Sequence, residues 1–220
     1  LVDPQLNQLV APCAACYLNL KKTDKLMADS PEMNAKIGEC LAAGGLSYRA
    51  GRVKVRHLLD VIYSDIGETA VRDKVVKPLT GVKIAPYYGC QVVRPLNGFD
   101  NPEYPMKMDE MFQWLGAEVV DYPVKSHCCG GHMTQLSEDM AFEMIRRLIG
   151  TADRMQADAM VTVCPMCQMN LEMRQAEKPN VPIFYFTELM GLAFGLSEAR
   201  NWWGKHLIST APVLSSAGLS

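Results

Sequence analysis

Short apolar runs alternate with helical repeats along most of this chain. Apolar side chains at Met108, Met111, Phe112 and Leu115 follow the i, i+3, i+4, i+7 spacing of a helix that stops at Gly116. The predicted strands cover 53–55, 82–88, 118–122, 159–163 and 183–186. The predicted helices cover 34–43, 58–67, 108–115, 138–155 and 188–194, with two more after Cys16 and at Cys164. Alternation of this kind predicts an α/β fold with small parallel sheets, flanking helices and right-handed crossovers.

The helical repeats also predict which faces are buried. The helix after Cys16 is expected to bury Leu18, Leu20, Leu26 and Met27. Ser137 is expected to cap the next long helix. Its expected inner face consists of Met140, Met144, Ile145, Leu148, Ala152 and Met155. Cys40, among helical Ala and Leu residues, is expected to be an ordinary core cysteine.

Five of the eight cysteines form one ordered series, Cys90, then Cys128-Cys129-Gly130-Gly131, then Cys164-Pro165-Met166-Cys167. The adjacent pair suits a single tetrahedral zinc ion poorly, because neighbouring side chains diverge in a strand and in a helix. Iron–sulfur clusters take four thiolates as a rule. The fifth thiol therefore indicates either a larger or less regular cluster, or one cysteine kept free for chemistry. Buried thiols and a zinc site are the alternatives.

Three predicted strands each lead into a cysteine of the series. The carboxyl ends of parallel strands lie at one edge of a sheet, where ligands gather in open α/β folds. We therefore expect these cysteines to converge although they are far apart in sequence.

The chain also contains an internal repeat. Strand, Cys13-Ala14-Ala15-Cys16, helix, strand and helix in the first part match strand, Cys164 to Cys167, helix, strand and helix in the second. Residues 1–80 are therefore predicted to be the second half of a module whose complete form is 81–220. A lone cysteine and a Cys-Cys-Gly of the first module are expected upstream of Leu1.

The series resembles the cysteine-rich CCG domain, which occurs twice in the B-type subunit of heterodisulfide reductase. The resemblance implies a noncubane [4Fe-4S] cluster held by Cys90, Cys128, Cys129, Cys164 and Cys167, at which a disulfide is split by successive one-electron transfers. It implies that Cys13 and Cys16 are two ligands of another cluster, complete only with the missing N-terminal part. It also implies partners similar to the electron-relaying C-type protein and the A-type flavoprotein of heterodisulfide reductase, and a small-molecule disulfide as substrate.

Residues next to the cysteine pair have expected roles of their own. Gly130 and Gly131 are expected to let the backbone approach the cluster. His127 and His132 are candidate proton donors to departing thiolates, with local hydrogen bonding as the alternative role. Cys164 lies at a helix start, where the dipole is expected to lower the thiol pKa.

Two other functions stay open at this point. A CCG module can transfer electrons within a complex that oxidises hydroxy acids, glycerol 3-phosphate or succinate. A zinc-bound structural protein of a larger complex is the other alternative.

Composition bears on the partners and the cellular compartment expected for the protein. The net charge of −2 argues against nucleic acid as a main partner. No apolar run approaches 18 residues, so no direct membrane span is expected. Paired cysteines in a chain of 220 residues suit metal binding in a reducing cytoplasm better than a disulfide scaffold.

Overall fold

Two parallel sheets form the framework of the chain. The computed structural model describes residues 7–94, 99–175, 181–216 and 218. The smaller sheet pairs β1 (Gln8–Ala11) with β2 (Lys54–His57). The larger sheet has the order β4-β3-β5-β6, formed by β3 (Lys83–Tyr87), β4 (Glu118–Val119), β5 (Ala159–Thr162) and β6 (Ile183–Tyr185). All pairs are parallel. The predicted α/β class with small parallel sheets and flanking helices is confirmed.

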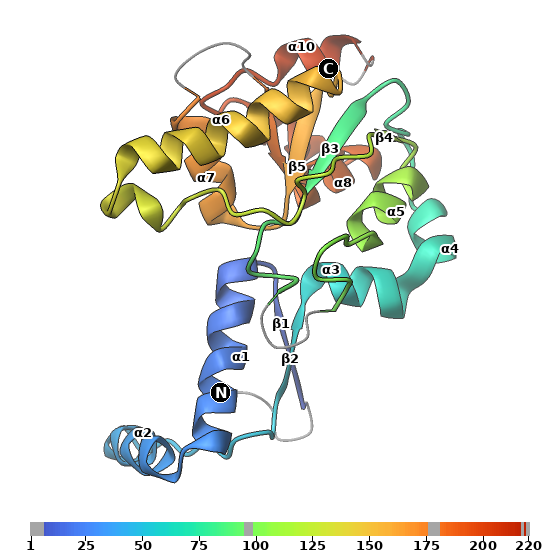
Figure 1. Cartoon of the computed structure of the whole chain (residues 1–220). Coiled ribbons are helices and arrows are strands. Elements are labelled where there is room, and N and C mark those ends of the chain that lie inside the picture. The colour runs from blue at the N-terminus through green and yellow to red at the C-terminus, as the bar shows by residue number, and fades with distance from the viewer. Residues whose placement is uncertain (1–6, 95–98, 176–180, 217, 219–220) are drawn as a thin grey trace.

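Helices connect the strands and cover the larger sheet. In Figure 1, α6 crosses in front of this sheet and α8 lies behind it, while α1 stands beneath with its N-terminal end directed at the sheet. The helices are α1 (Ala14–Asp29), α2 (Pro31–Ala43), α3 (Leu58–Val61), α4 (Gly67–Arg72), α5 (Lys107–Trp114), α6 (Glu138–Arg154), α7 (Pro165–Met173), α8 (Phe186–Ala193), α9 (Arg200–Trp203) and α10 (Ala211–Ser216). A π-helical turn, η1 (Ile62–Ile66), joins α3 to α4, and η2 (Met133–Gln135) and η3 (Ser197–Ala199) are 3-10 turns.

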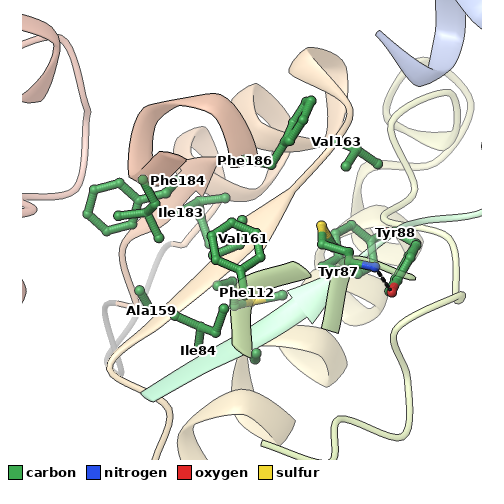
Figure 2. Packing of buried hydrophobic residues seen from close by; sticks show 14 of the residues in the cluster. Ile84, Tyr87, Tyr88, Phe112, Ala159, Val161, Val163, Ile183, Phe184 and Phe186 are labelled. Atoms are coloured by element: carbon green, nitrogen blue, oxygen red, sulfur yellow. Dashed lines mark hydrogen bonds between the residues drawn. The ribbon is translucent and has the colours of Figure 1, made fainter. Parts of the chain in front are cut away.

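The core lies on both sides of the central strands. All four residues of β5 are buried, as are four of the five in β3, because helices cover both faces. Figure 2 shows Ile84, Val161 and Phe184 from three adjacent strands, with Phe112 of α5 packed against them. Tyr87 and Tyr88 are also completely buried, at the end of β3 that leads to Cys90.

The expected internal repeat is visible in the order of elements. β1, α1, β2 and α3, with α2 inserted between α1 and β2, repeat as β5, α7, β6 and α8. Cys13 and Cys164 each occupy the N-cap of the helix that follows. Residues from the first part of the chain, 1–80, and from the second part, 81–220, contribute to one hydrophobic cluster. The amide N–H groups of Val76 and Lys77 donate to the carbonyl of Ala193, so the end of the first part packs on the second. The module boundary at residues 80 and 81 stays a prediction.

Three predicted burial patterns are wrong. Leu20 and Leu26 are 41% and 44% exposed, because α1 contacts the rest of the chain through Tyr17, Leu18 and Met27. Met140 is exposed, and the inner face of α6 is instead centred on Ala141, Ile145, Leu148, Ile149 and Ala152. Cys40 is exposed as well, because α2 buries none of its residues.

Two local predictions also needed correction. The strand expected at 118–122 ends at Val119, because the chain turns back over 123–126 toward the end of β3. Ser137 does occupy the N-cap of α6, but its side chain makes no capping hydrogen bond. None of the helices in the described part of the chain combines the length and the hydropathy that a membrane span requires.

Candidate functional site

The structure brings together all five cysteines of the series. Cys90 follows β3, Cys164 follows β5, and Cys167 lies in the first turn of α7. The Sγ atoms of Cys129 and Cys167 are 3.5 Å apart. The Cys128 thiol interacts with those of Cys90 and Cys129, and the Cys167 thiol with that of Cys164. The five thiols therefore form one continuous group at the carboxyl end of the larger sheet.

A buried polar network holds the Cys128 loop against the end of β3. The amide N–H groups of Tyr88 and Gly89 donate to the carbonyl oxygen of Lys125, at 2.9 and 3.0 Å. The Lys125 ammonium forms a buried ion pair with Asp109, and the hydroxyl of Tyr88 donates to the same carboxylate at 2.6 Å. The hydroxyl of Tyr87 donates to the carbonyl of His127 at 2.8 Å. These contacts set the distance between Cys90 and the cysteine pair.

Close backbone approaches shape the cysteine pair itself. Gly130 has φ +76°, and a Cβ there would lie 3.2 Å from Cα of Ala141, so a side chain would be both strained and crowded. The amide N–H of Gly130 donates to Sγ of Cys128 at 3.3 Å. Asn170 of α7 is buried and donates to the carbonyl of Cys129 at 2.8 Å. The pair is thus fixed by backbone as well as side-chain contacts.

Hydrogen bonds between the thiols lower the pKa of some of these cysteines and raise the pKa of others. Bonds with Cys129 and Cys90 lower the pKa of Cys128 far below the usual thiol value, and the bond with Cys128 raises the pKa of Cys90. The bond with Cys167, followed by backbone amides of α7, lowers the pKa of Cys164 to about 6. The helix start therefore contributes as expected, but the neighbouring thiol is the larger cause.

The Cys13 and Cys16 pair lies next to the same end of the sheet. The amide N–H of Ala14, between them in sequence, donates to the carbonyl of Val163 at 3.2 Å. The hydroxyl of Tyr185 lies within hydrogen-bond distance of two carbonyl oxygens, that of Pro12 and, at 3.1 Å, that of Val163, and its one hydrogen is shared between them. The segments that precede the two Cys-x-x-Cys motifs are thereby joined.

The two candidate histidines have different surroundings. Burial, followed by the charges of Arg147 and Arg94, lowers the pKa of His127. His132 lies with its Nε2 atom 3.2 Å from the amide nitrogen of Gln91. His127 also lines a cavity with Cys128, whereas His132 is placed by a local hydrogen bond.

Sequence reasoning missed the residues that position the thiols, mainly Lys125, Asn170 and Tyr185. No motif marks Lys125 or Asn170. The internal repeat offered a signal for Tyr185, because it ends β6 where His57 ends β2, each directly before a helix. His57 itself is buried among the rings of Tyr17, Phe99 and Phe186.

The donor set suits an iron–sulfur cluster. All five side chains are thiols, the usual ligands of such clusters. Among the residues that the structure describes, no three or more His, Cys, Asp or Glu side chains are arranged to hold a single metal ion. Thiols spread along a continuous row match a cofactor of several atoms better than one ion.

Comparison with known proteins adds a family match. Residues 84–172 match the model of the CCG cysteine-rich domain. A crystal structure of a hypothetical protein from Helicobacter pylori has a similar fold, with a TM-score of 0.65 over 89% of this chain and 36% of that one. The sequence identity there is 12%, so this likeness concerns the fold alone.

Two relatives are similar over most of the chain. The membrane anchor protein of the 8-methylmenaquinol:fumarate reductase of Wolinella succinogenes is 34% identical over 197 residues, covering 86% of this chain and 68% of that protein. The B-type subunit of the ferredoxin:CoB-CoM heterodisulfide reductase of Methanosarcina mazei is 29% identical over 224 residues, covering 94% and 74%.

Proposed function

Because this chain belongs to the CCG cysteine-rich domain family, which includes the B-type subunit of heterodisulfide reductase, we propose that it is an iron–sulfur protein that reduces a small-molecule disulfide to two thiols. The observation that carries the proposal is the continuous group of five thiols at the end of the larger sheet. An oxidoreductase of this kind needs a redox centre, and no other cysteine group of the described chain matches this one in size.

Cys90, Cys128, Cys129, Cys164 and Cys167 would hold a noncubane [4Fe-4S] cluster. Such a group, when bound, supplies electrons one at a time to a disulfide, which takes two. Cys13 and Cys16 would contribute to a second cluster together with residues outside this sequence.

Other residues of the chain would support that chemistry. The backbone turn at Gly130 brings its own amide N–H to Sγ of Cys128, where it stabilises negative charge on sulfur. His127 and His132 are the proposed proton donors to the departing thiolates. A lowered pKa disfavours the imidazolium form of His127 at pH 7, so this residue would stabilise a departing thiolate mainly through a hydrogen bond from its imidazole N–H group.

Electrons would reach the chain from partners. We propose proteins similar to the electron-relaying C-type protein and the A-type flavoprotein of heterodisulfide reductase, in the cytoplasm. The support is similarity to the B-type subunits of that enzyme from two Methanosarcina species.

A second candidate function is electron transfer within a fumarate-linked or related dehydrogenase complex. The 34% identity to part of a fumarate reductase favours it. In that case the same thiols would hold a cluster that passes electrons to another protein of the complex, with no disulfide bound.

Metal analysis of matched variants tests the proposal. After anaerobic purification, we expect about four iron and four acid-labile sulfide per chain, with an electron paramagnetic resonance signal. Cys129→Ser should lose more than half of the iron, because its thiol lies inside the group. Cys40→Ser is the matched control, since Cys40 is exposed and outside the series, and it should keep its iron.

Two outcomes would contradict the proposal. If the purified protein contained zinc and no acid-labile sulfide, the thiols would form a structural zinc site. If Cys129→Ser and Cys40→Ser lost equal amounts of iron, the five thiols would not be the ligands of the cluster. Thiol release from a small disulfide, with a reduced dye as electron donor, then separates the candidates. A loaded protein that releases no thiol is an electron carrier.

A further inference from the structure

Tyr87 places a buried phenol beside the five thiols. It is the last residue of β3, and its side chain is completely buried. Its hydroxyl donates to the carbonyl of His127 at 2.8 Å. Burial raises the pKa of Tyr87 well above its ordinary value, and the charges of four thiols raise it further, those of Cys167, Cys129, Cys128 and Cys90. The phenol therefore keeps its proton at neutral pH and lies among the sulfur atoms of the series.

The hydroxyl of Tyr87 approaches Cys167 as well as His127. A Cβ atom at Gly89 would lie 3.5 Å from this hydroxyl oxygen and 3.4 Å from Sγ of Cys167. The same small space, which a glycine leaves open, therefore borders both atoms. Gly89 has φ +67°, a backbone conformation that favours glycine. Sγ of Cys167 is in turn 3.5 Å from that of Cys129, so the hydroxyl faces the inner part of the thiol group.

One hydrogen serves two acceptors at this position. A tyrosine hydroxyl donates a single hydrogen, which the carbonyl of His127 accepts in the structure. A sulfur atom that gains negative charge is a stronger acceptor than a neutral carbonyl, because hydrogen bonds to charged groups are the stronger ones. An increase of negative charge on Cys167 therefore favours rotation of the hydroxyl from the carbonyl to the sulfur.

We propose that Tyr87 is a positioning residue for the redox centre, and that its hydroxyl turns from the carbonyl of His127 toward Cys167 when reduction adds negative charge to the sulfur. The O–H bond stays intact, so no proton is transferred. The electron comes from the partner protein, or from a chemical reductant in the test. The new hydrogen bond stabilises the reduced state and raises the reduction potential. This role rests on the proposed function only in requiring a cluster at the thiols, and it applies to disulfide reduction and to electron transfer alike.

Tyr122 provides a matched control within the same core. Its side chain is also completely buried, and its hydroxyl donates to a backbone carbonyl, that of Leu148, at 2.9 Å. Burial raises the pKa of Tyr122 as well, but the charge that acts on it is that of Arg154 and not that of a thiol. Tyr87→Phe and Tyr122→Phe therefore each remove one buried hydroxyl, and only the first removes a donor beside the sulfur atoms.

Potentiometric titration of the anaerobically purified, iron-loaded protein tests the inference. Electron paramagnetic resonance follows the reduction, and no disulfide is added. Tyr87→Phe should reduce the equilibrium constant of one-electron reduction about tenfold, which lowers the potential by about 59 mV. Fluorotyrosine at position 87 is a more acidic phenol and a stronger donor, so it should raise the potential. Tyr122→Phe should leave the potential unchanged, although urea titration should show similar losses of stability in the two phenylalanine variants.

Four outcomes separate this role from a purely structural one and from the proposed function. An unchanged potential in Tyr87→Phe, or the same shift in Tyr122→Phe, would overturn the role of Tyr87. If Tyr87→Phe does not fold, the fluorotyrosine protein keeps the hydroxyl, and an unchanged or lower potential there would also overturn the role. A protein without iron would overturn both this role and the proposed function. An iron-loaded protein that releases no thiol from a disulfide, but shows the expected shifts, would overturn disulfide reduction alone.

Discussion

Lys125 shows how one buried charge can position a site. Its side chain is completely buried, and its ammonium pairs with Asp109 and lies 4.3 Å from the ring centroid of Tyr104. Burial raises the pKa of Asp109, although Lys125 lies beside it. The Lys125–Asp109 ion pair connects the loop before Cys128 to α5. Burying these two charges costs desolvation free energy, but the contact that they form fixes the position of the loop that leads to the thiols.

Removal of this one charge should be severe. Lys125→Met leaves Asp109 buried without its cation, and we expect the free energy of unfolding to fall by about 3–5 kcal/mol. Urea titration measures the change. Lys25→Met is the control, because the Lys25–Asp29 pair is exposed, and it should cost less than about 1 kcal/mol. Similar losses in the two variants would show that the buried pair does not matter for stability.

Among the elements, α7, α8 and the segment after α9 meet at a single histidine. The side chain of His206 is 2% exposed and lies between Glu172 of α7, at 2.6 Å, and Glu188 of α8, at 3.2 Å. Burial lowers the pKa of His206, but hydrogen bonds with the two carboxylates outweigh this and raise it to about 9. A charged imidazole thus ties the C-terminal segment to the helix that carries Cys167.

Stability should therefore decline in alkaline solution. The folded pKa of about 9 exceeds the ordinary value of 6.5. The stabilisation is complete below pH 6.5 and is lost as pH rises through 9. We expect roughly 1–2 kcal/mol, because water partly screens Glu188. Unfolding measured across this pH range should show the loss in the native chain, and His206→Gln should remove it. An unchanged pH dependence in the variant would exclude His206 as the cause.

At the scale of the whole molecule, Tyr185 links the two sheets. Its hydroxyl joins the segments before Cys13 and Cys164, and burial followed by the nearby thiol charges raises its pKa. Figure 1 shows α1 with its N-terminal end at this junction. One side chain from the larger sheet thus holds the Cys-x-x-Cys motif of the smaller one.

Loss of that hydroxyl should loosen the smaller sheet first. Tyr185→Phe leaves two carbonyl groups without this donor, at a cost of about 1–2 kcal/mol. Amide hydrogen exchange should become faster in β1 and α1 and change little in β3 and β5. Tyr48→Phe is the control, because Tyr48 bonds Asp24 within the first part. Uniformly faster exchange would indicate global destabilisation in place of a local junction.

The sequence by itself determined the fold class, the places of the main elements and the five-cysteine series. Periodic hydrophobic positions and adjacent cysteines are local signals, and strands that lead into cysteines imply one shared edge of a sheet. Only the tertiary structure decided which helix faces are buried, as the exposed Leu20, Leu26, Met140 and Cys40 show. It also decided the roles of Lys125, Tyr185 and Asn170. Their partners lie on other elements, and a single charge or hydroxyl carries no period or spacing from which a distant contact can be predicted.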